Sequence, residues 1–298
     1  MTKLVECIPN FSEGVNTTII ESLADIVRNT PGATLLDYSA DASHNRSVFT
    51  YVGSIEAAKV CAVALAKYAA ENIDLTKHVG EHPRMGAVDV MPFVPVKNMT
   101  MDECIEISKQ VGEEIAAVTG MPVFLYEESA TKETRRNLAT IRKGQFEGMA
   151  AKMAKDAWKP DFGPALPHPT AGVVAVGARM PLIAFNVNLS TADVNIANNI
   201  AKIVRGSSGG FKHVKGIGIM LEDRGIAQVS MNLVNYEGTP IYRVVELIRA
   251  EAARYGVVVT GTELIGLAPA KALIDSAEYY LQIENFDYGK QVLENHLL

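Results

Sequence analysis

The sequence lacks any apolar run of roughly 18–20 residues, the length that a membrane-spanning helix requires. Glu6 interrupts the N-terminal stretch before the apolar segment of a secretory signal begins, so we expect no export signal. Cysteine is also scarce: the three thiols lie far apart, each in an apolar stretch, at Cys7, Cys61 and Cys104. Such cysteines are typical of buried thiols in a reducing compartment. These absences predict a cytoplasmic protein that binds no membrane.

Clustered positive charge is missing as well. The 298 residues include 28 Lys+Arg and 34 Asp+Glu, for a net charge of −6, and no basic run exceeds two residues, as at Arg135-Arg136. A nucleic-acid-binding surface needs many basic groups facing the phosphates, so we expect no nucleic-acid partner. The sequence contains no G-x-x-x-x-G-K-[ST] phosphate loop, and residues 206–210 lack the G-x-G-x-x-G spacing. A small anionic substrate requires only a few local positive groups and is compatible with this composition.

Hydrophobic periodicity predicts alternating strands and helices in both halves of the chain. In the first half we expect strands at 4–9, 33–37, 47–52, 87–96 and 123–126, and helices at 17–28, 55–71 and 101–118. In the second half we expect strands at 182–188, 216–221, 227–234 and 257–264, and helices at 191–204, 242–255 and 268–281. Ser190 is the expected N-cap of the helix at 191–204.

Both halves therefore follow the order β-α-β-β-α-β-α, which contains the ferredoxin-like unit of two helices on one face of an antiparallel sheet. We predict an α+β fold that duplicates two ferredoxin-like (βαββαβ) subdomains, an N-terminal one at 1–180 and a C-terminal one at 181–298. The segment 131–178 between the two units is expected to be irregular, since it holds Pro160, Pro164, Pro167 and Pro169. A connection of that length is usually functional.

The stretch GEHPRMGAVD at 80–89 is the richest in groups that can carry chemistry. His82 precedes Pro83, which favours an extended backbone and restricts the direction of the imidazole. A histidine donates and accepts protons near neutral pH, and Arg84 is placed to hold an anion. The alternative is that His82 is an ordinary histidine of a surface loop.

The same stretch overlaps an H-x-x-E-H zinc pattern that runs from His78 to His82. That pattern works when both histidines project from one face of a helix. Gly80 weakens a helix, Pro83 disfavours helical geometry at His82, and no third ligand has suitable spacing. We therefore expect no metal.

Two further stretches are candidates for binding. The polar segment DYSADASHNR at 37–46 holds Asp41, Asn45 and Arg46, which are suited to an amidine and to carboxylates; the alternative is a hydrated hairpin connection. With Asn10 and Arg84, these three residues are the candidate substrate-binding groups. The segment FGPALPHPTAG at 162–172 predicts a stiff loop able to frame a flat ring, or simply an interdomain linker.

These stretches together resemble the glutamate formimidoyltransferase family. The resemblance rests on VECIPNFSEG at 5–14, HNRS at 44–47, GEHPRMGA at 80–87 with Asp89, DFGP at 161–164, GAR at 177–179 and LIAFNVN at 182–188. It runs over essentially the whole chain, in order and at similar spacing. Because the chain stops at Leu298, it resembles the stand-alone form, without the cyclodeaminase domain of the bifunctional animal enzyme.

The resemblance implies a homodimer of two ferredoxin-like subdomains packed around a substrate groove, with His82 as the catalytic histidine. It places the folate-binding segment on Gly163, Pro164, Ala165, Leu166, Pro167, His168, Pro169, Thr170, Ala171 and Gly172. The interior of this segment differs from the animal sequences. An aspartate associated with the position of Ser39 is replaced here by Asp41 two residues later, so the supporting carboxylate is either Asp37 or Asp41.

The expected reaction is transfer of the formimino group from N-formimino-L-glutamate to N5 of tetrahydrofolate, in histidine degradation and one-carbon metabolism. Tetrahydrofolate, with or without a polyglutamate tail, is then a co-substrate, and no metal takes part. Two alternatives stand beside this expectation. One is salvage of 5-formyltetrahydrofolate on the same site, and the other is a non-catalytic ferredoxin-like sensor of a small ligand.

Overall fold

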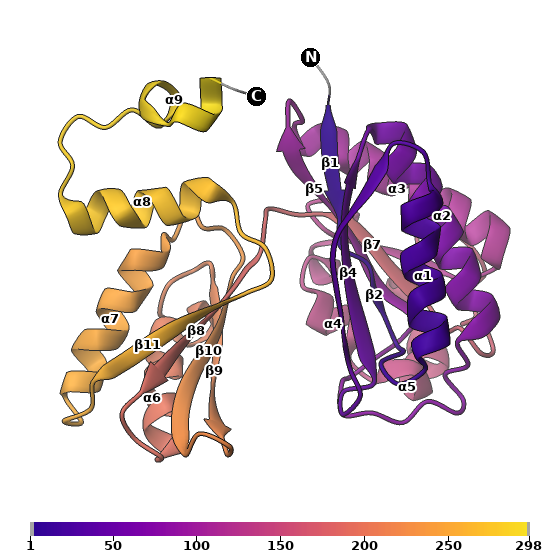
Figure 1. Cartoon of the computed structure of the whole chain (residues 1–298). Helices are drawn as coiled ribbons and strands as arrows, with labels where there is room; N and C mark the ends of the chain where they lie inside the picture. Colours follow the sequence, from indigo (N-terminus) through magenta and orange to yellow (C-terminus); the bar gives the residue numbers. More distant parts are fainter. Residues whose placement is uncertain (1–2, 297–298) are drawn as a thin grey trace. The chain divides into compact units, whose positions relative to one another are not determined.

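The computed structural model describes residues 3–296 and separates into two compact units that divide after Arg179. Figure 1 shows the order of elements, and each unit is described by itself. The first unit contains β1 (Leu4–Cys7), β2 (Asn10–Phe11), α1 (Thr17–Asn29), β3 (Ala33–Asp41), β4 (Arg46–Gly53), α2 (Ile55–Asn72), β5 (Val88–Lys97), α3 (Met101–Thr119), β6 (Val123–Glu127), α4 (Leu138–Arg142), α5 (Gln145–Met153) and β7 (Val174–Ala178).

The long helices of the first unit begin at polar caps. The side chain of Asn16 accepts hydrogen bonds from the first turn of α1, and that of Ser54 does so for α2. Thr100 and Glu103 form a reciprocal capping box at the start of α3, and Gly120, with φ of 71°, ends this helix in the left-handed conformation. These signals place the helix boundaries within one residue of the predicted ones.

The sheet of the first unit combines antiparallel and parallel pairs. β3 pairs with β4, β4 with β1, and β1 with β5, all antiparallel, while β5 and β6 flank β7 in parallel. The expectation that 131–178 is irregular was wrong, because this segment supplies α4, α5 and the strand β7, which lies between β5 and β6. Residues of β7 are buried on both faces, so its sequence is a continuous apolar run without the alternation that marks a half-exposed strand.

The strands of the first sheet separate two hydrophobic cores. Val174 and Val176 of β7 join the large core that includes residues of α1, α2 and α3, whereas Ala175 joins a smaller core with residues of α4 and α5. Alternate side chains of a strand point to opposite faces, so the two cores lie on opposite faces of the sheet. We call the face bearing α4 and α5 the second face of this sheet.

The hairpin of β3 and β4 differs from the prediction. β3 was expected to end at Asp37 but continues to Asp41, because pairing with β4 extends through the polar segment. The connection is thereby reduced to residues 42–45. In β4, Phe49 and Tyr51 belong to the large core, so Arg46 points to the second face by the alternation of the strand.

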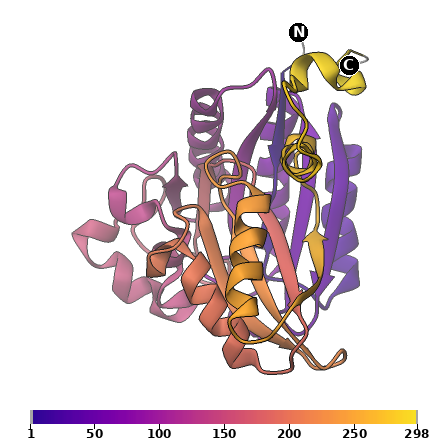
Figure 2. The same ribbon diagram turned by 90° about the vertical axis from the view of Figure 1, so that its left-hand side faces the viewer.

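The second unit contains β8 (Ile183–Leu189), α6 (Val194–Val204), β9 (Val214–Leu221), β10 (Ile226–Leu233), α7 (Ile241–Ala253), β11 (Val259–Ile265), α8 (Ala270–Leu281) and α9 (Tyr288–Gln291). Its strands form an antiparallel sheet in the order β11-β8-β10-β9. Figure 2 shows α6 and α7 lying over one face of this sheet, where they bury the second unit's core. The fold as a whole is α+β with two sheets.

Ser190 is not the N-cap of α6, contrary to the prediction. The helix begins later, at Val194, with Asp193 as its cap. The hydroxyl of Ser190 instead accepts a hydrogen bond of 2.9 Å from the backbone N–H of Val258.

Two composition-based observations have structural counterparts in residues 3–296. Cys7, Cys61 and Cys104 are free and buried. No helix in this described part of the chain combines the length and apolar character needed to cross a bilayer.

Candidate active site

The loop that carries His82 is held against the hairpin connection between β3 and β4. The backbone N–H of Glu81 donates to the carbonyl of Ser43 (3.1 Å), and that of His82 donates to the carbonyl of His44 (3.4 Å). Gly80 permits this approach, since a Cβ at that position would lie 2.4 Å from the carbonyl oxygen of His44. The two polar motifs, at 37–46 and 80–89, therefore form one surface although they are at least 34 residues apart in sequence.

The motif at 5–14 joins the same surface through Asn45. The side-chain oxygen of Asn45 accepts from the backbone N–H of Gly14 (2.8 Å), and its amide donates to the carbonyl of Val79 (2.9 Å). A Cβ on Gly14 would lie 2.2 Å from the carbonyl oxygen of Asp41, so only glycine fits here. Asn45 thus ties three segments together, and its predicted contact with substrate stays a prediction.

Arg46 and Asn10 lie side by side on the second face. A guanidinium nitrogen, Nη2, of Arg46 donates to the side-chain oxygen of Asn10, whose amide donates to the carbonyl of Ile8 (2.9 Å). Arg46 makes no other side-chain hydrogen bond within residues 3–296, and its buried Nε has no partner. Burial lowers the pKa of this guanidinium, and Arg142 lowers it further, while Asp89 raises it.

Asp89 is a buried carboxylate on the bulge where β5 pairs with β2. Asn10 faces Val90 and Phe11 faces Val88, which leaves Asp89 as the extra residue of β5. One carboxylate oxygen accepts from the backbone N–H of Met85 (2.9 Å), and the other accepts from Nη2 of Arg142 in α4 (2.5 Å). Asp89 therefore connects the His82 loop to α4.

Arg142 was not among the residues singled out from the sequence. Its partner Asp89 is 53 residues away along the chain, so no local sequence pattern predicts the pair. The sequence did contain one signal: Asp89 lies within the apolar run of β5, and a carboxylate there requires a buried partner.

The surroundings of His82 favour the neutral imidazole. Burial lowers its pKa to about 3, with further lowering by the positive charges of Arg46 and Arg142 and by His44 and His78. The side chain is half-buried on the surface formed by the converging loops. A neutral imidazole has a free lone pair at neutral pH and can accept a proton.

Arg84 and His78 are engaged in contacts within the chain. Arg84 pairs through two nitrogens with the carboxylate of Glu147 (2.9 and 2.6 Å) and donates through Nε to Nδ1 of His78 (3.2 Å). The Nε2 atom of His78 lies 2.8 Å from the carbonyl oxygen of Asn45. Both ring nitrogens of His78 are therefore occupied, residues 78–82 are not helical, and the H-x-x-E-H zinc pattern is not realised. The substrate-binding role of Arg84 stays a prediction.

Asp41 and His44 form an exposed pair at the end of the hairpin. One oxygen of Asp41 accepts from the backbone N–H of His44 (2.9 Å), and the other lies 3.0 Å from its Nδ1. These hydrogen bonds lower the pKa of Asp41. Asp37 is exposed on β3, and which of the two aspartates supports an amidine stays open.

The end of the predicted folate segment packs on the backbone directly after the His82 motif. The backbone N–H of Ala87 donates to the carbonyl of Ala171 (2.9 Å), and Gly86 pairs with Gly172. Gly172 has φ of 68°, and a Cβ on it would lie 2.2 Å from the carbonyl oxygen of Met85. The structure thus brings this end of the segment to the His82 loop.

The beginning of the same segment is anchored by a buried ion pair. Arg135, which is 1% exposed, donates to the carboxylate of Asp161 (2.7 Å), and the same carboxylate accepts from the backbone N–H of Leu125 (2.8 Å). Between the two anchors, residues 163–166 are exposed. The segment is therefore a tethered loop with an accessible interior, and its contact with folate stays a prediction.

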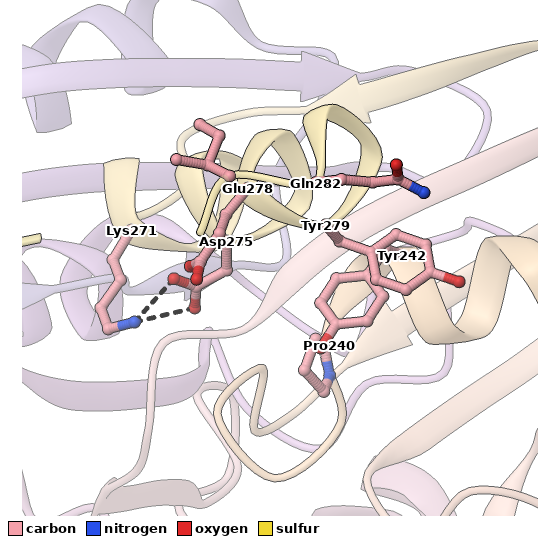
Figure 3. Close-up of a pocket in the computed structure, with 8 residues that line it drawn as sticks. Pro240, Tyr242, Lys271, Asp275, Glu278, Tyr279 and Gln282 are labelled. Carbon is pink, nitrogen blue, oxygen red and sulfur yellow. Dashed lines mark hydrogen bonds and ion pairs between the residues drawn. The ribbon is translucent and has the colours of Figure 1, made fainter. Parts of the chain in front are cut away.

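A cavity of about 490 Å³ lies in the second unit, between the start of α7 and α8 (Figure 3). Tyr242 and Tyr279 stack there with ring centroids 4.3 Å apart, and Lys271 pairs with Asp275 at 2.7 Å. None of the site residues predicted from the sequence lines this cavity.

Both units of the chain match known protein families. Residues 4–179 match the family model of the formiminotransferase domain, N-terminal subdomain, and residues 184–295 match that of the formiminotransferase domain. The chain belongs to the formiminotransferase family. It is therefore a transferase, and the resemblance seen in the sequence is confirmed.

Three relatives match nearly the whole of this chain. A glutamate formimidoyltransferase from Streptococcus pyogenes serotype M1 is 64% identical over 298 residues, which is 100% of each chain. One from Thermoplasma acidophilum is 44% identical, over 99% of this chain and 97% of the relative. The formimidoyltransferase-cyclodeaminase of Gallus gallus is 47% identical over 95% of this chain, but only 53% of its own length is covered.

The first unit thus brings together the imidazole of His82, the guanidiniums of Arg46 and Arg142, and the buried carboxylate of Asp89. Such a set can move a proton at His82 and hold an anion at the arginines. Within residues 3–296, no group of three or more histidine, cysteine, aspartate or glutamate side chains is arranged to hold a metal ion.

Proposed function

We propose that this chain transfers the formimino group of N-formimino-L-glutamate to N5 of tetrahydrofolate, giving 5-formiminotetrahydrofolate and L-glutamate. The observation that carries the proposal is the half-buried His82, whose pKa is lowered by burial and by the half-buried Arg46 and Arg142, in a chain whose relatives are named glutamate formimidoyltransferases. Histidine degradation and one-carbon metabolism are the setting that this reaction implies.

The chemistry requires a proton to move between two nitrogens. Attack of N5 on the amidine carbon forms a C–N bond and gives a tetrahedral centre that carries three nitrogens. N5 then loses a proton, the glutamate nitrogen gains one, and the bond from carbon to that nitrogen breaks. His82 accepts the first proton and delivers it to the leaving nitrogen, a contribution of about 10²–10⁴-fold. Holding both substrates together lowers the barrier further.

The binding groups follow from their places on the first unit. Arg46, Asn10 and Asn45 lie on the surface that carries His82, and either Asp41 or Asp37 stabilises the cationic amidine. The loop at 163–172 binds the folate, because its far end is fixed beside the His82 motif by Gly172 while its interior stays accessible. Tetrahydrofolate is a co-substrate, and none of these steps uses a metal.

Each unit is proposed to be a ferredoxin-like subdomain, at 1–180 and 181–298, related by duplication. Support comes from the strand orders. In the first unit the order β3-β4-β1-β5 places the second, third, first and fourth strands of a βαββαβ unit side by side. In the second unit the order β9-β10-β8-β11 places them identically. The antiparallel pairing of these strands is what the ferredoxin-like unit requires.

A cytoplasmic location and a homodimer complete the proposal. The three buried free thiols agree with a reducing compartment. Sedimentation of the purified chain measures the oligomeric state, and a monomer at micromolar concentration would remove the dimer from the proposal.

A substrate test decides the function. Mixed with tetrahydrofolate and formiminoglutamate, the protein should release glutamate and form 5-formiminotetrahydrofolate, with neither product when either substrate is omitted. Faster turnover of 5-formyltetrahydrofolate would replace formimino transfer by salvage. Binding of both ligands without turnover would instead make the chain a sensor. The neutral formyl group is expected to react more slowly, because it gains nothing from a carboxylate that stabilises a cation.

A further inference from the structure

The second face of the first sheet holds a surplus of positive charge. Arg46 and Arg142 each carry five N–H donors, yet each makes a single side-chain hydrogen bond within the described residues. The Nε atom of each is buried and has no partner. One carboxylate, that of Asp89, accompanies two guanidiniums, and it is already bonded to Met85 and Arg142.

Arg46 and Arg142 are half-buried, and donors shielded from water are normally satisfied. Arg84 has a bidentate carboxylate partner in Glu147. Both terminal nitrogens of Arg135 have acceptors in Asp161 and a backbone carbonyl, although its Nε also lacks a partner within the described residues. In Arg46 and Arg142, by contrast, only Nη2 has an acceptor in the described part of the chain. The missing acceptors of Arg46 and Arg142 therefore indicate a place where an anion binds.

We propose that Arg46 and Arg142 together bind the α-carboxylate of formiminoglutamate, with Asp89 as the positioning residue that orients Arg142. This inference rests on the proposed function and adds Arg142 and Asp89 to the site. Arginine suits the role, since its planar donors match a carboxylate bidentately.

The choice of the α-carboxylate follows from the substrate's connectivity. Its carbon is three bonds from the amidine carbon, whereas the γ-carboxylate and the glutamate tail of folate are farther from the reacting atoms. Arg46 follows two residues after His44, whose carbonyl accepts from the backbone N–H of His82, and Arg142 is joined through Asp89 to Met85 of the same loop. An anion held by both arginines therefore lies beside the His82 loop. The α-carboxylate is the anion that the reaction itself brings to this place.

Binding of that carboxylate also changes the imidazole. His82 faces the positive charges of Arg46 and Arg142 and the imidazoles of His44 and His78, which together with burial hold its pKa low. An anion on the arginines cancels part of this field and raises the basicity of His82. The substrate thereby makes His82 a better proton acceptor at the moment when it is needed, so loss of the α-carboxylate should reduce kcat and not KM alone.

The test combines one substitution with one change of substrate. Wild type and Arg142→Gln are assayed with formiminoglutamate and with N-formimino-4-aminobutyrate, which lacks only the α-carboxylate. We expect either change alone to lower kcat/KM about 10- to 100-fold, and both together to cost little more than one. Arg136→Gln, at an exposed arginine paired with Glu128, is the matched control and should leave both substrates unaffected.

Two further arms separate the competing explanations. The double variant Asp89→Asn with Arg142→Gln removes both charges of the buried pair, and it reports on the anion site if Arg142→Gln alone folds poorly. Replacing tetrahydrofolate with tetrahydropteroate, which lacks the glutamate tail, distinguishes the folate carboxylates. We expect the effect of Arg142→Gln to be the same with either folate.

Additive losses from the substitution and the missing α-carboxylate would overturn the inference, as would an effect of Arg142→Gln that disappears with tetrahydropteroate. These outcomes leave wild-type turnover intact and so do not touch the proposed function. If the wild type does not turn over formiminoglutamate at all, that result contradicts the proposed function itself.

Discussion

The two units present their sheets differently on the face opposite the main helices. In the first unit this second face carries Arg46 and Arg142, whose donors are mostly unused. In the second unit the corresponding face carries Asn188 and Gln228, which are buried, and Glu263. The three polar side chains of the second unit form hydrogen bonds with one another. The face in the first unit is therefore a candidate binding site, and the one in the second unit is a structural network.

The network of the second unit is closed by short hydrogen bonds. Gln228 donates to the side-chain oxygen of Asn188 (2.7 Å) and to Glu263 (3.0 Å), and Asn188 donates to Glu263 (3.0 Å). Arg224 adds an ion pair to the same carboxylate (2.6 Å). This closed network stabilises the pairing of three strands and leaves few groups free to bind a ligand. The unsatisfied donors of Arg46 and Arg142 are, by contrast, available to a ligand.

Removal of the imidazole should produce the largest effect on activity. We expect His82→Ala to lower kcat by at least about 10²-fold, because the proton shuttle is lost while the binding groups remain. The measurement is steady-state kinetics with circular dichroism as the check on folding. A folded, fully active His82→Ala protein would remove His82 from the mechanism.

Removing the carboxylate charge on the first sheet should destabilise the protein more than removing the one on the second sheet. Asp89→Asn leaves Arg142 without a counter-charge and should cost about 3 kcal/mol in the free energy of unfolding. Glu263→Gln, at a partly exposed network, should cost about 1 kcal/mol or less. Urea titrations of both variants measure the difference. Equal losses would mean that the charge on the first sheet is no more critical than the network on the second.

Replacing glycine with alanine at two positions tests how tightly the backbone packs at the end of the loop 163–172. Gly172→Ala should destabilise the protein by about 1–3 kcal/mol and raise KM for tetrahydrofolate, since the backbone is left-handed and the Cβ meets Met85. Gly261→Ala is the control in β11, where the nearest atom to a Cβ is 4.0 Å away. Thermal unfolding that shows no loss for Gly172→Ala would contradict the close packing of the loop's end.

The pH dependence of stability should carry the signature of His82. Its pKa in the folded protein, about 3, is below the ordinary value near 6.5, so between these values the unfolded chain binds the extra proton. Stability therefore falls as pH falls through this window. Between pH 7.5 and 5 we expect wild type to lose up to about 2 kcal/mol more than His82→Gln. Identical pH profiles of unfolding would show that His82 titrates normally.

Local signals explain which parts of the fold were predictable. The helices α1, α2 and α3 have polar caps and periodic apolar faces, so the sequence placed them within one residue. The strand β7 and the helices α4 and α5 were missed, because β7 is defined by its parallel neighbours and the helices are short. Such features depend on tertiary pairing that no local window contains.

The same distinction holds for the candidate site. The unusual GEHPR stretch marked His82 and Arg84 directly, because His, Pro and Gly together constrain a loop. The pairing of Asp89 with Arg142 depends on a bulge in β5 and on the packing of α4, so it emerged only with the fold. The engagement of Arg84 by Glu147 was equally invisible in the sequence.

The central claim is that burial and the positive charges of Arg46 and Arg142 together hold the pKa of His82 low, and that an anion on the arginines raises it. A titration of the imidazole tests this claim most directly. In protein labelled at its six histidines, comparison with His82→Gln assigns the His82 resonance in NMR spectra. The account predicts a neutral ring at pH 5 in the free protein, with a pKa that rises in saturating L-glutamate and in Arg142→Gln. A pKa near 6.5 in the free protein, unchanged by L-glutamate, would contradict it.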